Sequence, residues 1–306
     1  MSKTAKQPRQ PPQPHPLAED IRPGQSLELL KELHILTRDG KLNQDSRRKL
    51  KQVYHLVRFI EPLLLQVLAD KPDIQLVDHG AGKSYLGFIL YDLFFRERMA
   101  AAPGSRIYGI ETRDELVRKS EELAARLGFP GMSFENLSVA ASTTSERLPA
   151  QVDVVTALHA CNTATDDAIH FALEKKARFI VLVPCCQAEV ASVLKKNKAR
   201  ALPRDALTEI WRHPVHTREF GSQLTNVLRC LQLEAHGYQV TVTELVGWEH
   251  SMKNELIIAS YQDLPRKRPS ERLREVLQLL GLEELGGRFL AEAVALRRPD
   301  PINASR

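Results

Sequence analysis

Short apolar segments alternate with helix-like segments along most of the chain. The segments at 74–78, 106–111, 132–139, 152–158 and 178–184 have the length and composition of strands. The stretch 85–94 instead places its apolar residues on one face of a helix. Strands this apolar, separated by helices, are typical of a parallel sheet that is covered on both faces.

The pattern changes after a helix expected at 222–236. Two further strands, 238–245 and 255–261, follow with only a short connection between them. A connection of this length cannot hold a crossover helix, so these two strands should be antiparallel. The sequence therefore predicts an α/β fold with a doubly wound, mostly parallel seven-stranded sheet that ends in an antiparallel hairpin. This Rossmann-like arrangement is that of class I methyltransferases.

The flanking segments differ from this core. Residues 1–25 are rich in Gln, Pro and Lys and are expected to be a disordered basic tail. Residues 26–69 predict an N-terminal helical extension, kinked or divided at Pro62. The core domain is expected at 70–262 and a C-terminal helical appendix at 263–306.

Charge and cysteine content narrow the class of protein. The net charge is +5 and the basic residues gather in the tail, at 195–200 and at 266–268, which points weakly to a polyanionic partner. A solvated surface is the ordinary alternative for each run. No apolar run is long enough for a membrane span, and the N-terminus lacks the apolar region of a secretory signal. The four cysteines form no disulfide pattern, so a cytoplasmic protein is expected.

The sharpest motif joins the first strand to the first helix and reads Asp78-His79-Gly80-Ala81-Gly82-Lys83-Ser84. Glycines let a backbone turn tightly and approach a ligand closely, and ligands of doubly wound sheets lie at the carboxyl ends of the strands. Glu111, at the end of the second strand, is placed to accept hydrogen bonds from ribose hydroxyls.

Three ligands compete for this turn, beside a glycine turn with no ligand. A P-loop needs a glycine at position 77, where the chain has Val. The dinucleotide motif needs a glycine at position 85, where it has Tyr. The third ligand is S-adenosylmethionine (SAM), because an acidic residue two positions before Gly-x-Gly resembles motif I of methyltransferases. The resemblance implies that Asp78 orients the turn and the sulfonium end of the ligand.

With these residues, three more segments resemble the methyltransferase-domain-32 family of class I methyltransferases, to which the domain of certain transfer RNA ribose 2′-O-methyltransferases is related. The segments are Leu158-His159-Ala160-Cys161 with Thr165 and Asp166, Val183-Pro184-Cys185-Cys186, and Lys253-Asn254, within roughly residues 50–262. The resemblance implies SAM as cofactor and an RNA substrate. His79 departs from the family, which often has a small or apolar residue there.

The candidate catalytic residues are His159, Cys185, Lys253 and Asn254. His159 follows the fourth strand beside the expected methyl donor, where it is either a general base or a packed side chain that shapes the pocket. Cys185 is either a soft pocket wall or, like Cys161, a nucleophile for pyrimidine methylation. Adjacent cysteines cannot easily chelate one ion, so no metal is expected.

Lys253 and Asn254 lie in the expected hairpin loop, where they contact a phosphate and a base or form an ordinary polar loop. The motif Asn/Asp-Pro-Pro-Tyr/Phe is absent after the fourth strand, which argues against N6-adenine methylation. We therefore expect a SAM-dependent methyltransferase acting on RNA, either transfer or ribosomal. A small-molecule or protein methyltransferase and a catalytically degenerate scaffold are the alternatives.

Overall fold

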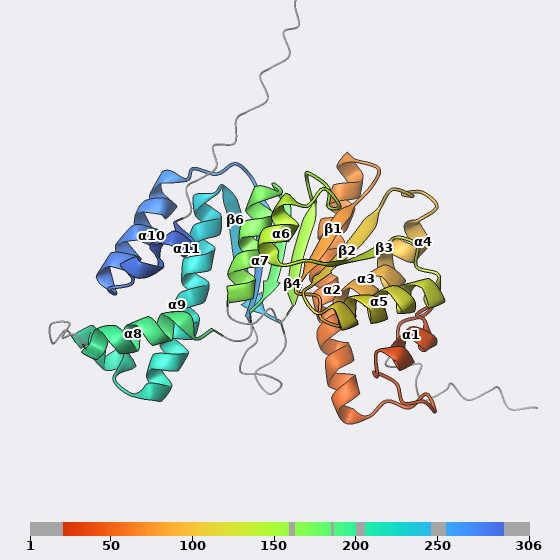
Figure 1. Cartoon of the computed structure of the whole chain (residues 1–306), viewed down its shortest axis with the longest axis horizontal. Coiled ribbons are helices and arrows are strands. Elements are labelled where there is room, and N and C mark those ends of the chain that lie inside the picture. The colour runs from red at the N-terminus through yellow and green to blue at the C-terminus, as the bar shows by residue number, and fades with distance from the viewer. Residues whose placement is uncertain (1–20, 159–162, 185–186, 200–205, 246–254, 291–306) are drawn as a thin grey trace, which may run out of the picture.

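A computed structural model describes residues 21–158, 163–184, 187–199, 206–245 and 255–290. Its centre is one sheet of seven strands in the order β3-β2-β1-β4-β5-β7-β6 (Figure 1). The strands are β1 Gln75–His79, β2 Arg106–Glu111, β3 Met132–Asn136, β4 Val154–Leu158, β5 Phe179–Val183, β6 Tyr238–Glu244 and β7 Glu255–Tyr261. The first five pair in parallel, and β7 pairs antiparallel with both β5 and β6. The predicted fold class is confirmed.

Helices cover both faces of the sheet. They are α1 Leu27–Glu32, α2 Gln44–Asp70, α3 Tyr85–Leu90, the π-helical turn η1 Tyr91–Phe95, α4 Arg96–Arg98, α5 Asp114–Leu127, α6 Val139–Thr144, α7 Thr163–Glu174, α8 Glu189–Ala199, the 3-10 turn η2 Ala206–Trp211, α9 Pro214–Ala235, α10 Lys267–Leu279, the 3-10 turn η3 Glu283–Leu285 and α11 Gly286–Phe289. Among the described residues, no helix has the length and apolarity needed to cross a membrane.

Neighbouring strand residues enter different cores because successive side chains point to opposite faces of a sheet. Leu76 and Val154 pack with the buried face of α2, whereas Val77 and Val155 pack with Phe171 of α7. A third core lies away from the sheet, where α8, η2, α9, α10 and α11 bury their apolar faces together. The C-terminal helices thus extend a layer that α8 and α9 begin.

Helix α2 crosses the whole depth of the sheet. Its last turn lies at the amino ends of the strands, because Asp70 pairs with Arg178 just before β5 and Lys71 pairs with Asp153 just before β4, at 2.5 and 2.7 Å. A 27-residue helix is about 40 Å long, whereas a five-residue strand spans about 17 Å. The first half of α2 therefore projects beyond the carboxyl ends of the strands (Figure 1).

Two local expectations differ from the structure. Pro62 lies inside α2, which continues through it as one helix instead of dividing. The sequence spacing of Thr112 and Glu115 was that of a capping box, but α5 has Arg113 at its N-cap with no side-chain cap. The Thr112 hydroxyl donates to Glu111 Oε1 instead, at 3.3 Å.

Candidate cofactor site

The glycine turn after β1 lies beside the end of β2. In the parallel register His79 is opposite Ile110, so Glu111 extends one residue further, level with the turn. Gly80 and Gly82 have φ angles of +67° and +57°, a backbone conformation that side chains disfavour. The N–H of Gly82 donates to Glu111 Oε2 at 2.8 Å. Local backbone conformation and strand register together therefore bring the two expected halves of the site into contact.

Glu111 is a buried, ionised carboxylate at this point, only 8% exposed. Its Oε1 accepts hydrogen bonds from the backbone N–H and the Nε of Arg113, both at 3.0 Å. Burial acts to raise the pKa of Glu111, but the hydrogen bonds from the Arg113 side chain and backbone and from Gly82 outweigh it and lower the pKa to about 2. The Arg113 side chain is itself largely exposed, so it is free to leave one of these oxygens to a ligand hydroxyl.

Asp78 is the second acidic group, at the carboxyl end of β1. It is 2% exposed, and the hydroxyl of Thr156 in β4 donates to its Oδ1 at 2.8 Å. Burial raises the pKa of Asp78 to about 7, against the smaller lowering effect of the Thr156 hydrogen bond. Among the described residues no cation pairs with Asp78, and a carboxylate in so dry a place is well suited to a positively charged ligand.

The other expected cofactor residues are placed differently. His79 is buried, with its ring 5.4 Å from the Phe171 ring and Nε2 3.4 Å from the Ser142 hydroxyl. Burial lowers the pKa of His79 to about 4, so the ring is neutral and packs inside the domain. Lys83 is exposed and lines a hollow of about 330 Å³ between α1 and α5. The N–H of Ala81 donates to the carbonyl of Ile110 at 2.9 Å, which fixes the turn against β2.

The four candidate catalytic residues, His159, Cys185, Lys253 and Asn254, lie outside the described residues. Cys161 and Cys186 lie outside them as well. Cys230 is described, but burial raises the pKa of its thiol to about 12, so it is not a reactive group. In the described part of the chain, no cluster of three or more His, Cys, Asp or Glu side chains has the arrangement of a metal site.

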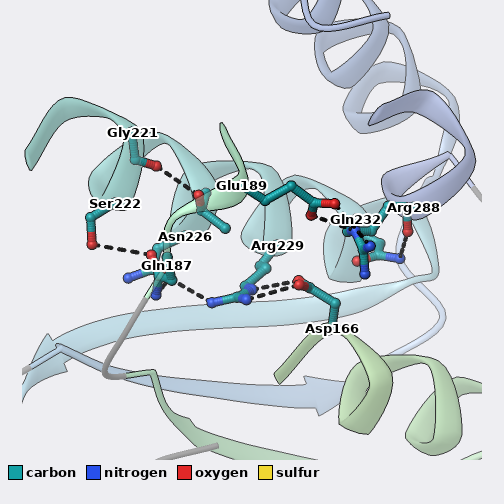
Figure 2. Close-up of polar contacts among 10 residues, drawn as sticks. Asp166, Gln187, Glu189, Gly221, Ser222, Asn226, Arg229, Gln232 and Arg288 are labelled. Atoms are coloured by element: carbon teal, nitrogen blue, oxygen red, sulfur yellow. Dashed lines mark hydrogen bonds and ion pairs between the residues drawn. The ribbon is translucent and has the colours of Figure 1, made fainter. Parts of the chain in front are cut away.

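Sequence reasoning missed a polar network on α9 (Figure 2). Arg229 is fully buried and forms a two-point ion pair with Asp166, with Nε–Oδ1 and Nη2–Oδ2 distances of 2.6 and 3.0 Å. One turn earlier, Asn226 accepts from Arg229 and donates to Glu255, and the side-chain oxygen of Gln187 accepts from Arg229 Nη1 at 2.9 Å. An arginine and an asparagine among the apolar residues of a long amphipathic helix were the available signal.

The comparisons with known proteins agree with this fold. Residues 48–193 match the family model described as a methyltransferase domain. This part of the chain, which holds the first five strands and the glycine turn, is similar to a methyltransferase domain. The glycine turn, the ionised Glu111 and the buried Asp78 fit SAM, the methyl donor of such domains.

The curated relatives are proteins described as glutathione S-transferase C-terminal domain-containing. The one from Bos taurus is 24% identical over 242 residues, which are 73% of this chain and 35% of the relative. The one from Mus musculus is 25% identical with the same coverage. The chain thus spans about a third of the length of the curated relatives it matches.

Solved structures with similar topology are distant in sequence. An rRNA methylase from Streptococcus thermophilus is 8% identical with a TM-score of 0.37, over 63% of this chain and 89% of that one. Magnesium protoporphyrin IX methyltransferase of Synechocystis PCC 6803 with bound SAM is 11% identical with a TM-score of 0.40, over 79% of this chain and 100% of that one. Likenesses this low do not relate the chain to either substrate.

Proposed function

We propose that the protein is a SAM-dependent methyltransferase of RNA, with the glycine turn, Asp78 and Glu111 holding the cofactor. SAM supplies an electrophilic methyl group when bound. Glu111 would accept hydrogen bonds from the ribose hydroxyls, and the Asp78 carboxylate would stabilise the cationic end of the cofactor. The chain's remaining task is to place the acceptor in line with the methyl group.

One observation carries the choice of RNA: the exposed basic surface on the first half of α2. Residues 47–58 contain five Lys or Arg and no Asp or Glu. Three of them, Lys49, Lys51 and Arg58, are exposed and form no ion pair with any residue that the structure describes. This half of α2 projects past the edge of the sheet that carries the glycine turn. Cations there would contact the phosphates of a substrate much larger than the cofactor.

The basic runs expected from the sequence support RNA binding less well. Lys196 pairs with Glu284, Arg266 with Asp263, and Lys267 with Glu271, all within 4 Å. Local carboxylates therefore offset part of the charge of both runs. The exposed cations of α2 are better placed to bind RNA than those of either run, although buried apolar residues separate Lys51 and Arg58 from the cations at 47–49.

The test compares two double charge reversals that change the net charge equally. Lys49→Glu/Lys51→Glu alters the α2 surface. Arg268→Glu/Arg274→Glu alters two exposed cations of α10 that form no ion pair with any residue that the structure describes. Binding of an unmodified transfer RNA transcript is measured by fluorescence anisotropy at several salt concentrations. The α2 variant should bind about tenfold or more weakly and lower the slope of log affinity against log salt by about 1 for each lost phosphate contact.

The α10 variant should bind close to wild type, and both variants should bind SAM as wild type does in calorimetry. Transfer of a tritiated methyl group from SAM to the same transcripts and to total RNA completes the test. RNA binding that ignores salt, or equal losses in both variants, would contradict the proposed RNA surface. Methyl transfer only to protein or small-molecule fractions would show that the substrate class is wrong.

A further inference from the structure

The carboxylate of Glu111 has all of its hydrogen-bonding positions occupied by groups of the protein itself. Its Oε1 accepts from the backbone N–H and the Nε of Arg113, both at 3.0 Å, and from the Thr112 hydroxyl at 3.3 Å. Its Oε2 accepts from the N–H of Gly82 at 2.8 Å and from Arg113 Nη2 at 3.1 Å. An ionised carboxylate offers about four lone-pair positions, so these bonds from the described residues leave none for a ligand. A ribose hydroxyl can reach Glu111 only if a donor leaves.

The donors differ in how freely they can move. The N–H of Gly82 belongs to the glycine turn, which a backbone hydrogen bond holds against β2. The backbone N–H of Arg113 is fixed at the start of α5. The guanidinium, by contrast, ends a side chain that is 67% exposed. Ion pairs of exposed side chains add little to stability, so this group can rotate into water at small cost.

The guanidinium also covers the space in front of the glycine turn. A Cβ built at Gly82 would lie 3.8 Å from Arg113 Nη2 and 4.0 Å from Glu111 Oε2. Arg113 therefore fills the place where a ligand that touches both the turn and Glu111 would have to lie. The side chain of Glu111 is only 9% exposed, so its charge cannot be left without donors when Arg113 moves away.

We propose that Arg113 is a latch on the ribose position, which its guanidinium leaves when the cofactor binds; this inference rests on the proposed function. Two neighbouring N–H groups of the guanidinium reach the two oxygens of one carboxylate. The 2′- and 3′-hydroxyls of a ribose are also two neighbouring donors, so they replace both bonds and keep the buried carboxylate satisfied. A ligand with one hydroxyl replaces only one bond. The latch thus lowers the affinity for every ligand and selects for those with both hydroxyls.

The test removes the latch and leaves the carboxylate in place. Arg113→Ala deletes the guanidinium, and Arg113→Lys keeps the charge but cannot form the planar two-point pair. The side chain of Arg113 makes no capping bond to α5, so neither change removes a contact that begins the helix. Arg118→Ala is the matched control, because Arg118 lies on the same helix, is 66% exposed and pairs with Asp114 at 3.1 Å. Thermal unfolding shows first that each full-length variant is folded.

Calorimetry with SAM and with S-adenosylhomocysteine measures the cost of opening the latch. Arg113→Ala should bind both ligands about two- to fivefold more tightly than wild type, the range expected when one exposed ion pair no longer has to be broken. Arg113→Lys should lie between the two, and Arg118→Ala should match wild type. S-adenosylhomocysteine lacks the sulfonium charge. A gain for SAM alone would therefore mean that Arg113 repels this charge, and the latch would be refuted.

Nucleosides test the selection for two hydroxyls. Adenosine and 2′-deoxyadenosine differ in one hydroxyl and carry no charge. Because only adenosine replaces both bonds of the guanidinium, Arg113→Ala should improve the binding of adenosine more than that of 2′-deoxyadenosine, measured by ligand-observed nuclear magnetic resonance. Equal gains would overturn the selection.

The Nε–H signal of Arg113 follows the guanidinium directly. The signal is assigned by its loss in Arg113→Lys, and its hydrogen bond to Glu111 should slow its exchange with water in the free protein. Saturation with S-adenosylhomocysteine should speed this exchange at least tenfold and leave the Nε–H of Arg118 unchanged. A signal that stays protected in the complex would show that the guanidinium does not leave.

Failure of the latch and failure of the proposed function give different results. If wild type binds SAM and Arg113→Ala binds it no more tightly, the latch alone is wrong. If neither protein binds SAM, S-adenosylhomocysteine or adenosine, the cofactor site and the latch are wrong together. If the ligands bind as expected but no methyl group reaches RNA, the proposed substrate is wrong and the latch stands, because none of these measurements uses RNA.

Discussion

Replacing Asp78 by Asn should stabilise the protein at alkaline pH while weakening its binding of SAM. Asp78 is buried, and its side chain accepts a 2.8 Å hydrogen bond from the Thr156 hydroxyl. An asparagine has the same shape, keeps an oxygen that accepts this bond, and carries no charge. The ionised carboxylate of Asp78 therefore lowers the stability of the folded protein, and a neutral amide at this position does not.

The size of the effect follows from the pKa of Asp78, which burial raises from 3.8 to about 7. Because the folded state holds the proton more tightly than the unfolded chain, stability is greatest below the unfolded pKa and falls as pH rises towards the folded pKa. Between pH 5 and pH 8 linkage gives a loss of about 2.5 kcal/mol from this one group. The asparagine variant lacks this loss, so the variant should gain that much relative to wild type across the same range.

Urea unfolding at pH 5, 6, 7 and 8 measures how the stability difference between Asp78→Asn and wild type changes with pH. This change with pH does not depend on how well the amide itself packs. The control is Asp153→Asn at the opposite ends of the strands. Asp153 pairs with Lys71 at 2.7 Å and accepts from the N–H of Gln75, so its replacement should destabilise the protein at pH 8. A difference between Asp78→Asn and wild type that stays flat with pH, or that grows less favourable as pH rises, would refute the reasoning.

Three other predictions concern the glycine turn and the helix that follows it. If the ionised Asp78 binds the cationic end of SAM, the affinity for SAM, measured by calorimetry, should rise from pH 6 to pH 8 in wild type and should not change with pH in Asp78→Asn. A wild-type affinity that does not change with pH contradicts this role of Asp78. Ser84 has a left-handed backbone with φ of +50°, and its buried hydroxyl has no hydrogen-bond partner among the described residues. Both features cost stability, so Ser84→Gly should raise the free energy of unfolding, measured by urea titration, by up to about 1 kcal/mol. A Cβ at Gly87 would lie 2.6 Å from the Ser84 hydroxyl. Gly87→Ala should therefore destabilise the wild-type protein more than it destabilises the Ser84→Gly variant. If the two substitutions have additive effects on the free energy of unfolding, this contact is not the cause of the destabilisation.

The strands and the glycine turn could be predicted because their signals are local. Buried parallel strands must be apolar almost throughout, and β2 and β7 begin and end at the residues that the apolar pattern indicated. Gly128 ends α5 in a left-handed conformation, as a glycine after a helical pattern predicts. The short connection between the last two strands excluded a crossover helix, which was enough to predict the antiparallel hairpin.

Local signals did not determine which side chains become partners. Thr112 and Glu115 had the spacing of a capping box, but the Glu111 carboxylate captured the Thr112 hydroxyl. His79 looked like part of the ligand site because of its neighbours in the sequence. Its ring lies against Phe171 of α7, which a pattern within the glycine motif cannot reveal.

The sequence by itself thus determined the order and type of the strands, the sharp turn after β1 and the acidic residue that ends β2, because backbone conformation and apolar periodicity depend on near neighbours. Only the tertiary structure decided which polar groups meet. Asp166 and Arg229 are 63 residues apart, and Asn226 and Glu255 are 29 apart. The packing of α9 against the sheet buries Arg229 among these particular partners, and no pattern within α9 specifies them.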